Sequence, residues 1–191
     1  MDVHGEGFRV YLSSLATADA EDMARLADSP EIAGSIAAEG EFPSPYTKEH
    51  ALNFISFASS SLVDMQEVHL GMHLEDSKAL IGVAGLKNID TKNMKAEIGF
   101  WCGREYWGHG YTKEGVRLML HVAFEVLALH RVWATAFTTN ERSIKLMEGA
   151  GMKEEGVLRD DTKSSSGFWS SMLLSVVRSE YREPSRIAAG K

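Results

Sequence analysis

Residues 95–115, KAEIGFWCGREYWGHGYTKEG, contain the pattern from which the rest of the chain is interpreted. Residues 96–102 have the composition of a strand, and a turn that ends in Gly108-His109-Gly110 comes directly before a segment of helical apolar spacing. The first turn of a helix has unpaired N–H groups and a partial positive charge, and glycines let the backbone approach a ligand closely. The stretch therefore predicts a strand-to-helix turn that is able to hold a phosphate.

Two well-known phosphate-binding signatures do not match this turn. A P-loop requires Gly-x-x-x-x-Gly-Lys-Ser/Thr, and a dinucleotide fingerprint requires Gly-x-Gly-x-x-Gly with an acidic residue about 20 positions later. Residues 108–113, GHGYTK, fit neither pattern. A glycine turn of this kind also forms without a ligand, so the spacing alone leaves open whether a phosphate binds.

Length and composition limit the classes of protein. A chain of 191 residues is long enough for one domain with a single core. No apolar run approaches the ~20 residues of a membrane helix, and the single cysteine is typical of a reducing cytoplasm. A net charge of −7 argues against nucleic acid and is compatible with a cationic substrate, although solubility explains it equally well.

Hydrophobic periodicity predicts one α+β domain, with helices packed on a mostly antiparallel sheet, over residues 1–182. A polar loop is expected at 159–167, a loop or weak helix at 30–46, and a loose tail at 183–191. The predicted strands are 7–13, 67–74, 79–86, 96–102, 131–138, 152–158 and 170–177. The predicted helices begin at Thr17, Thr47, Tyr111 and Asn140 and end near residues 28, 58, 129 and 148.

Two separated motifs carry a resemblance to a known family. The first is WGHGYT at residues 107–112, and the second is NERSIKLMEGAGM at residues 140–152. In this order they resemble the GNAT superfamily of acetyl-CoA-dependent N-acetyltransferases, and within it the Rim-type branch that acetylates N-termini of ribosomal proteins. Three positions depart from the pattern: Trp107 replaces Arg or Gln, Thr112 is the last motif residue, and Ser171 replaces the acid of Trp-x-Asp.

The resemblance implies a twisted, mostly antiparallel GNAT sheet and a binding site for acetyl-CoA. Backbone N–H groups of the glycine turn are expected at the pyrophosphate, the Asn140 amide at the pantetheine arm, and Ser143 near the sulfur, where it can donate to the thiolate. The residues expected to bind acetyl-CoA are Phe100, Trp101, Cys102, Trp107, Gly108, His109, Gly110, Tyr111, Thr112, Asn140 and Ser143. Asn140 and Ser143 also suit the start of a helix, with Asn140 as its cap.

Acetyl transfer to an amine needs a group that removes a proton, because an ammonium cannot attack a thioester. Glu97 is the acidic residue on the central predicted strand and is the candidate base, acting through water; the alternative is a structural, ion-pairing Glu. Asp160 and Asp161 are candidates for a rival base or for a clamp on a cationic amine, with ordinary loop solvation as the alternative.

Two other kinds of chemistry are disfavoured. By strand alternation Cys102 points to the face opposite Glu97, which favours a core thiol over an acyl-enzyme nucleophile. His69 and His73 share a strand face but lie ~13 Å apart, too far to ligate one metal ion. We therefore expect no metal cofactor.

The sequence predicts a cytoplasmic N-acetyltransferase that moves an acetyl group directly from acetyl-CoA to a primary amine. A protein or peptide N-terminus is the favoured acceptor, and a small amine such as a polyamine, an amino acid or a drug is the alternative. A non-catalytic acetyl-CoA-binding regulator is a further alternative, motivated by the three departures. No nucleic acid or membrane partner is expected, and the chain is either a monomer or a homodimer.

Overall fold

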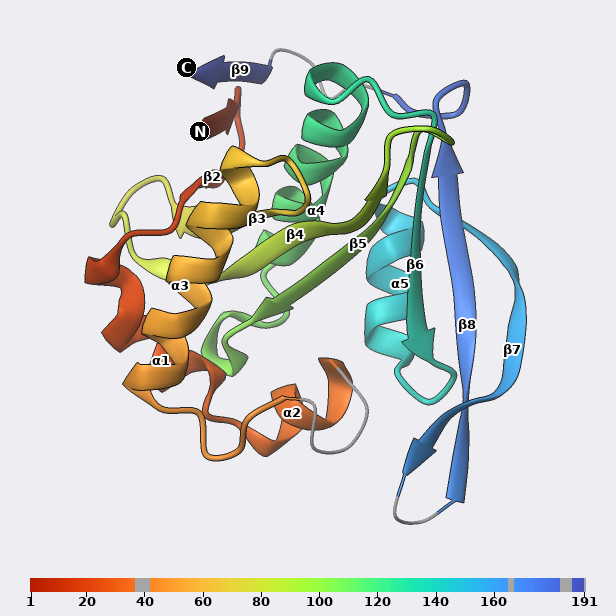
Figure 1. The fold of residues 1–191 in the computed structure, drawn as a ribbon, viewed down its shortest axis with the longest axis horizontal. Helices are drawn as coiled ribbons and strands as arrows, with labels where there is room; N and C mark the ends of the chain where they lie inside the picture. Colours follow the sequence, from red (N-terminus) through yellow and green to blue (C-terminus); the bar gives the residue numbers. More distant parts are fainter. Residues whose placement is uncertain (37–41, 165–166, 183–186, 191) are drawn as a thin grey trace.

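The computed structural model describes residues 1–36, 42–164, 167–182 and 187–190, which form a sheet with helices on both faces (Figure 1). The strand order is β7-β8-β6-β5-β4-β3-β2-β1-β9, and only β5 and β6 run parallel. The strands are β1 (Asp2–Gly5), β2 (Val10–Ser14), β3 (Val68–Leu74), β4 (Leu80–Asp90), β5 (Lys95–Cys102), β6 (Arg131–Phe137), β7 (Lys153–Ser164), β8 (Gly167–Val177) and β9 (Ile187–Gly190). The α-helices are α1 (Ala20–Ala27), α2 (Pro30–Ile36), α3 (Lys48–Val63), α4 (Tyr111–His121) and α5 (Glu141–Gly149).

The two faces of the sheet are covered by different helices. α1 and α3 pack on one face of β3 and β4, and α4 and α5 lie on the other face (Figure 1). Alternation along β5 follows these layers: Ile98 and Cys102 are buried in the core beneath α4, whereas Trp101 packs against the core beneath α1 and α3. Glu97 and Gly99 therefore belong to the α1–α3 face of the strand.

The parallel pair β5 and β6 is joined over only three residue pairs, from Lys95↔Arg131 to Glu97↔Trp133. Beyond these pairs the strands diverge, and β5 continues beside β4 while β6 continues beside β8 (Figure 1). The edge of β5 from Ile98 onward is consequently without a strand partner among the described residues. α5, which lies within the second sequence motif, packs behind this opening in the sheet. The opening therefore lies next to that motif.

The predicted α+β class and the order of the elements are confirmed, but several boundaries were wrong. β1 was not predicted. α3 continues past residue 58 to Val63, and the hydroxyls of Ser59 and Ser60 donate to carbonyls four residues earlier, within the helix, so the serines do not end it by capping. The segment 30–46, expected to be weakly helical at most, contains α2, and the helix predicted to reach residue 129 ends as a π-helical turn at Val122–Val126.

Two expectations at the C-terminal end also require correction. The predicted polar loop at 159–167 is largely strand, since β7 extends to Ser164 and β8 begins at Gly167. The tail expected to be loose contains β9, which pairs antiparallel with β1 from Asp2↔Gly190 to Gly5↔Ile187. The remaining residues of that predicted tail, 183–186 and 191, lie outside the described residues.

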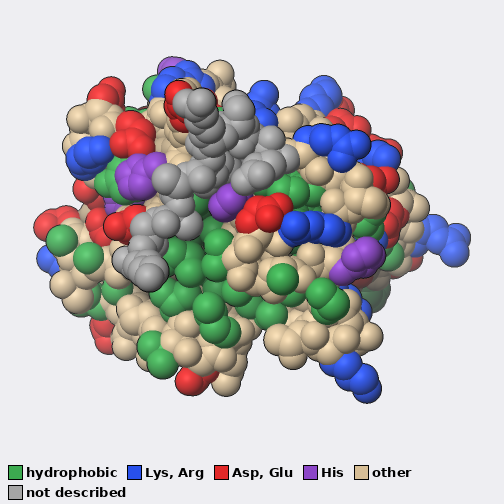
Figure 2. Space-filling view, turned by 90° about the horizontal axis from the view of Figure 1, so that it is seen from above, with side chains coloured by type: hydrophobic (Ala, Val, Ile, Leu, Met, Phe, Trp, Pro, Cys, Tyr) green, Lys and Arg blue, Asp and Glu red, His purple; other side chains and the backbone are tan. Residues whose placement is uncertain are grey.

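The surface seen from above the view of Figure 1 has acidic, basic and apolar side chains interspersed (Figure 2). Within the described ranges, no helix combines the length and apolar character needed to cross a membrane.

We predict a pH-dependent contribution to stability from a cluster that ties β7 and β8 to β6. The guanidinium of Arg131 donates two hydrogen bonds of 2.6 Å to Glu155, and the Ser175 hydroxyl also donates to this carboxylate. These bonds lower the pKa of Glu155 from 4.5 to about 2. The stabilisation is therefore complete above about pH 4.5 and is lost as the pH falls through about 2.

Glu155→Gln should lower the free energy of unfolding at pH 7 by at most about 1 kcal/mol, because the pair is partly exposed and screened by solvent. Urea unfolding at a series of pH values measures this difference, with Glu154→Gln, one residue earlier on the same strand, as the control. A difference that persists undiminished near pH 2 would contradict the assignment.

Candidate active site

The glycine turn before α4 has the backbone geometry of an anion-binding loop. Gly108 has φ +81° and Gly110, the N-cap residue of α4, has φ +83°. A Cβ atom on Gly108 would meet no described atom within 4 Å, so the turn is open to a ligand at this point. The N–H groups at the start of α4 and the positive end of its dipole therefore face this open space, and phosphate binding at the turn stays a prediction.

Arg9 holds this turn in place. It lies about a hundred residues from the turn in the sequence, so no local pattern predicts the contact. Its guanidinium donates to Glu114 (Nε–Oε1 3.0 Å) and to the carbonyl of His109 (2.8 Å). It also lies 4.7 Å from the centroid of the Tyr111 ring. The hydrogen bond to Glu114 raises the pKa of Arg9. One arginine in the connection between β1 and β2 thus fixes both the glycine turn and the first turn of α4.

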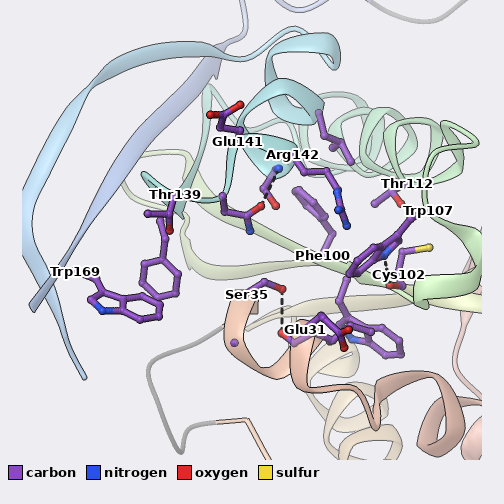
Figure 3. Close-up of a pocket in the computed structure, with 17 residues that line it drawn as sticks. Glu31, Ser35, Phe100, Cys102, Trp107, Thr112, Thr139, Glu141, Arg142 and Trp169 are labelled. Carbon is purple, nitrogen blue, oxygen red and sulfur yellow. Dashed lines mark hydrogen bonds between the residues drawn. The ribbon is translucent and has the colours of Figure 1, made fainter. Parts of the chain in front are cut away.

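Trp107, the first departure from the family pattern, connects the two sequence motifs. Its indole N–H donates to the carbonyl of Cys102 at 2.7 Å, which ties the turn to the end of β5. The guanidinium of Arg142, on α5, lies 4.1 Å from the centroid of the Trp107 ring and points toward it (Figure 3). A cation is therefore present beside Trp107, where the pattern that the chain resembles has Arg or Gln, but this cation comes from α5 and not from the turn itself.

A cleft of about 530 Å³ extends from this turn between α2, the end of β5 and the start of α5 (Figure 3). Seven of the residues predicted to bind acetyl-CoA line it: Phe100, Trp101, Cys102, Trp107, Thr112, Asn140 and Ser143. The other four, Gly108, His109, Gly110 and Tyr111, form the adjoining turn and the start of α4. Arg142, Trp169 and residues of α2 also line the cleft, and none of these was among the residues predicted to bind acetyl-CoA.

Asn140 has the capping role that the sequence left open beside a ligand role. Its side-chain oxygen accepts a hydrogen bond from the N–H of Ser143 at 3.2 Å, which caps α5. The capping bond uses the amide oxygen and leaves the Nδ2 donor group of the same side chain for another partner. Structural and binding roles are therefore compatible at this residue.

A second, smaller cavity of about 240 Å³ opens on the α1–α3 face of the sheet. Four residues line both cavities: Ser35, Phe100, Trp101 and Ser143. The smaller cavity is also lined by Phe54, His69, Gly85, Lys87, Glu97 and Gly99, and by residues of β6 on the other side of the opening between β5 and β6. The two cavities therefore meet at the opening in the sheet.

Comparison with known proteins identifies the family. A family model described as acetyltransferase (GNAT) domain matches residues 9–153. The chain belongs to the GNAT acetyltransferase family. It is therefore an acyltransferase, and acetyl-CoA is its acetyl donor.

Relatives and solved structures agree with this assignment. The uncharacterized N-acetyltransferase p20 of Bacillus licheniformis is 27% identical over 174 residues, which is 91% of this chain and 95% of p20. YdaF of Bacillus subtilis, by name a candidate ribosomal N-acetyltransferase, is 38% identical over 97 residues, 51% of this chain and 52% of YdaF.

Two solved structures share the fold at lower identity. RimJ of Mycobacterium smegmatis, in complex with CoA-disulfide, has a TM-score of 0.82 at 18% identity and covers 94% of this chain and 87% of its own. Spermidine N-acetyltransferase of Vibrio cholerae, in complex with CoA and spermine, has a TM-score of 0.75 at 20% identity and covers 90% and 97%. Most of this chain therefore has the same fold as these two structures.

Glu97 lies in the smaller cavity of this GNAT domain, with a side chain that is 13% exposed. One carboxylate oxygen lies 2.9 Å from the Lys87 ammonium on β4, and the other accepts a hydrogen bond of 2.9 Å from the Asn88 amide. The ion-pairing alternative that the sequence left open is thus present in the structure. A role of Glu97 as base stays a prediction.

Cys102 has the environment of a core thiol. Its side chain is buried on the α4 face of β5, opposite the face of Glu97, and burial raises the pKa of the thiol to about 11. A thiol with this pKa is protonated at neutral pH and is a poor nucleophile. Direct transfer is therefore chemically favoured over an acyl-enzyme on Cys102.

Asp160 and Asp161 do not lie where the sequence predicted. They are exposed on β7, where they line a separate surface hollow with Val157, Leu158 and Arg159, and neither lines the two cavities described above. β7 continues as a strand through both residues, with a register shift between Leu158 and Thr162, so within the described chain these carboxylates lie on β7 and not over the smaller cavity. The expected substrate clamp is not supported.

The remaining sequence expectations concern Ser171 and metal ligands. Ser171, which replaces the acid of the family pattern, is a buried residue of β8 opposite Phe137. His73 lies within hydrogen-bonding distance of Ser13 (3.1 Å). Among the described residues there is no group of three His, Cys, Asp or Glu side chains that could hold a metal ion.

We predict that the glycine turn is required for acetyl-CoA binding beyond its effect on stability. Gly108→Ala and Gly7→Ala form a matched pair, because their φ angles are +81° and +78° and both glycines have open space around the new Cβ. Each substitution should cost about 1–2 kcal/mol of stability through backbone strain. Only Gly108→Ala should weaken acetyl-CoA binding, by about tenfold or more, because its methyl group lies where the phosphates approach.

Isothermal titration calorimetry with acetyl-CoA measures the affinity, and thermal unfolding measures the strain of each variant. Equal affinities of Gly108→Ala and Gly7→Ala would mean that the phosphates bind elsewhere.

Proposed function

We propose that this GNAT enzyme transfers an acetyl group from acetyl-CoA to the free amino group at the N-terminus of a protein or peptide. The observation that carries the proposal is the meeting of two cavities at the opening between β5 and β6, with Ser35, Phe100, Trp101 and Ser143 shared by both. A donor and an acceptor bound in these cavities would have their reacting ends together at the opening. Proximity of this kind supplies a large part of the rate enhancement in a two-substrate reaction.

The residues of the larger cleft fit the chemistry of acetyl-CoA. The turn and the N-terminus of α4 would hold the pyrophosphate, and the guanidinium of Arg142 lies in the same cleft with a positive charge. The unpaired edge of β5 after Glu97 offers backbone donors and acceptors to the amides of the pantetheine arm, as a strand edge does to an extended peptide. Ser143, shared by both cavities, is the hydroxyl that would protonate the departing thiolate.

The smaller cavity favours an acceptor with one positive charge on an otherwise neutral chain. Its carboxylate, Glu97, is already paired with Lys87, so the lining offers little excess negative charge to a polycation. Hydroxyl, aromatic and backbone groups make up much of the rest of the lining. The names of YdaF and RimJ, both associated with ribosomal proteins or the Rim branch, agree with a protein N-terminus as acceptor.

A small amine is the second candidate acceptor. The volume of about 240 Å³ is sufficient for a small molecule, and a solved structure of the same fold contains spermine. A monoamine or an amino acid fits the paired charges of the cavity better than a polyamine does, because Lys87 repels additional ammonium groups. A cytoplasmic location belongs to the same proposal and is supported by the free, buried thiol of Cys102.

Acetyl-CoA should stabilise the folded chain in thermal unfolding. Saturation at about 100 times Kd should add roughly 2.7 kcal/mol, which for a chain of this length corresponds to an increase in Tm of about 5–10 °C. ATP and NAD at the same concentration are the controls. Absence of any shift at a high concentration of acetyl-CoA would contradict the proposed donor.

Turnover should be fastest with peptides that have a free N-terminus. The release of free thiol from acetyl-CoA is measured with a peptide, with the same peptide blocked at its N-terminus, and with monoamines, amino acids and polyamines. Mass spectrometry of the product then locates the acetyl group. Fast acetylation of a small amine together with slow acetylation of peptides would select the second candidate, and binding without turnover of any amine would select the regulator.

A further inference from the structure

His69 lies in the acceptor cavity, where none of the sequence motifs gives it a role. It stands on β3 beneath α3, and its ring packs against Phe54 (centroid distance 5.2 Å) and Phe57 (5.8 Å). Its side chain is only 14% exposed, and Nε2 lies 2.6 Å from a carboxylate oxygen of Glu67. A titratable ring that is nearly enclosed, paired with a carboxylate and in contact with a cavity is a candidate for proton transfer.

The other ring nitrogen, Nδ1, lies over Gly85, which is one of the residues that line the cavity. The sheet register places His69, Gly85 and Gly99 side by side on β3, β4 and β5. A Cβ atom on Gly85 would lie 2.3 Å from Nδ1 of His69, so this nitrogen lies directly above the backbone of β4. Any side chain at position 85 would displace the ring, and both glycines line the acceptor cavity.

The contact with Glu67 selects the tautomer of His69. A carboxylate only accepts hydrogen bonds, so Nε2 carries the proton and donates it to Glu67. Nδ1 then has the free lone pair, and no hydrogen-bond partner for it is found in the described ranges. The carboxylate also stabilises the imidazolium that forms when Nδ1 accepts a proton, as in other carboxylate–histidine pairs.

We propose that His69, oriented by Glu67, is the group that removes a proton from the acceptor amine. This inference rests on the proposed function, because it takes the smaller cavity as the acceptor site. Adjacent strands are about 4.8 Å apart, so an amine above Gly99 lies about that far from a nitrogen above Gly85. One water molecule with two hydrogen bonds of about 2.8 Å spans this distance. The proton therefore passes through a single water to Nδ1.

The proton balance of the reaction is complete with these groups. The ammonium of the acceptor loses one proton through the water to His69, and the amine nitrogen then forms a bond to the thioester carbonyl carbon. The carbon–sulfur bond breaks, and the electron pair leaves with sulfur. The second proton of the nitrogen goes to the thiolate, by way of the Ser143 hydroxyl, and His69 returns its proton to solvent. The products are the amide, free CoA thiol and one proton.

The charged groups around the ring favour His69 over Glu97 as proton acceptor. Glu67 lies beside the ring, and the described cavity wall contains Lys87 from β4 and Glu97 from β5. Both oxygens of Glu97 already accept from Lys87 or Asn88, and protonation of this carboxylate would break its ion pair. Protonation of His69 strengthens its contact with Glu67 instead.

Steady-state kinetics at a range of pH values tests the assignment with the full chain and the best peptide acceptor. His69→Gln should lower kcat by about 100-fold or more at neutral pH and leave the affinity for acetyl-CoA within about twofold, because general base catalysis supplies about 10²–10⁴-fold. The variant should regain rate as the pH rises and free amine forms in solution. His4→Gln is the matched control, because it removes another His–Glu contact of 2.6 Å, with Glu75, on β1 and away from the cavity.

Glu97→Gln should lower kcat less than His69→Gln does, and imidazole should restore part of the rate to His69→Gly, which a purely structural role would not allow. A wild-type rate in His69→Gln, or a larger loss in Glu97→Gln, would overturn the role of His69 and leave the proposed function intact. Absence of turnover by the wild-type chain with any amine would instead overturn the proposed function itself.

A measurement on the wild-type chain decides the tautomer without any variant. Side-chain ¹⁵N shifts of His69 should show a protonated Nε2 and an unprotonated Nδ1 in the neutral ring, and the same shifts should change when an acceptor peptide is added. A neutral ring protonated at Nδ1 would overturn the proposal, because Nδ1 would then have no lone pair for the amine proton.

Discussion

The divergence of β5 from β6 after their third residue pair is the constraint on which the site depends. Where the strands are paired, the sheet is closed; where they separate, one edge of β5 and both cavities become accessible. The separation is bounded on one side by the ladder of β5 with β4 and on the other by the ladder of β6 with β8, which the contact of Arg131 with Glu155 reinforces. Beyond the third pair, β5 stays paired with β4 and β6 stays paired with β8, but β5 and β6 no longer pair with each other.

The donor side of the opening is held by contacts that join distant segments. Arg9, which immediately precedes β2, braces the glycine turn through Glu114 and the carbonyl of His109. Trp107 connects the same turn to the end of β5 and carries the guanidinium of Arg142 from α5 on its face. The departure from the family pattern at position 107 is therefore accompanied by a different way of bringing a cation to the cleft, so it gives little reason to expect an inactive enzyme.

Features that depend on local sequence could be predicted, and features that depend on tertiary contacts could not. β5, the glycine turn and the cap at Asn140 follow from spacing within about ten residues, and the structure has all three. The hairpin of β7 and β8 was cut short in the prediction, because a polar segment of a protruding strand has the composition of a loop. The pairing of Glu97 with Lys87 and the position of His69 depend on strand register across the sheet, for which the sequence contains no local signal.

Gly85 and Gly99 are neighbours in the sheet, but the first is required by packing and the second leaves space for a substrate. Gly85 is required by packing, since a Cβ atom there would lie 2.3 Å from the ring of His69. A Cβ atom on Gly99 would meet no described atom within 4 Å, so packing within the described chain does not require this glycine. The space above Gly99 adjoins both the unpaired edge of β5 and the ring nitrogen above Gly85. An acceptor amine that occupies this space would reach both the acetyl donor and the proton acceptor. Binding of the amine therefore explains the absence of a side chain at Gly99, which packing does not explain.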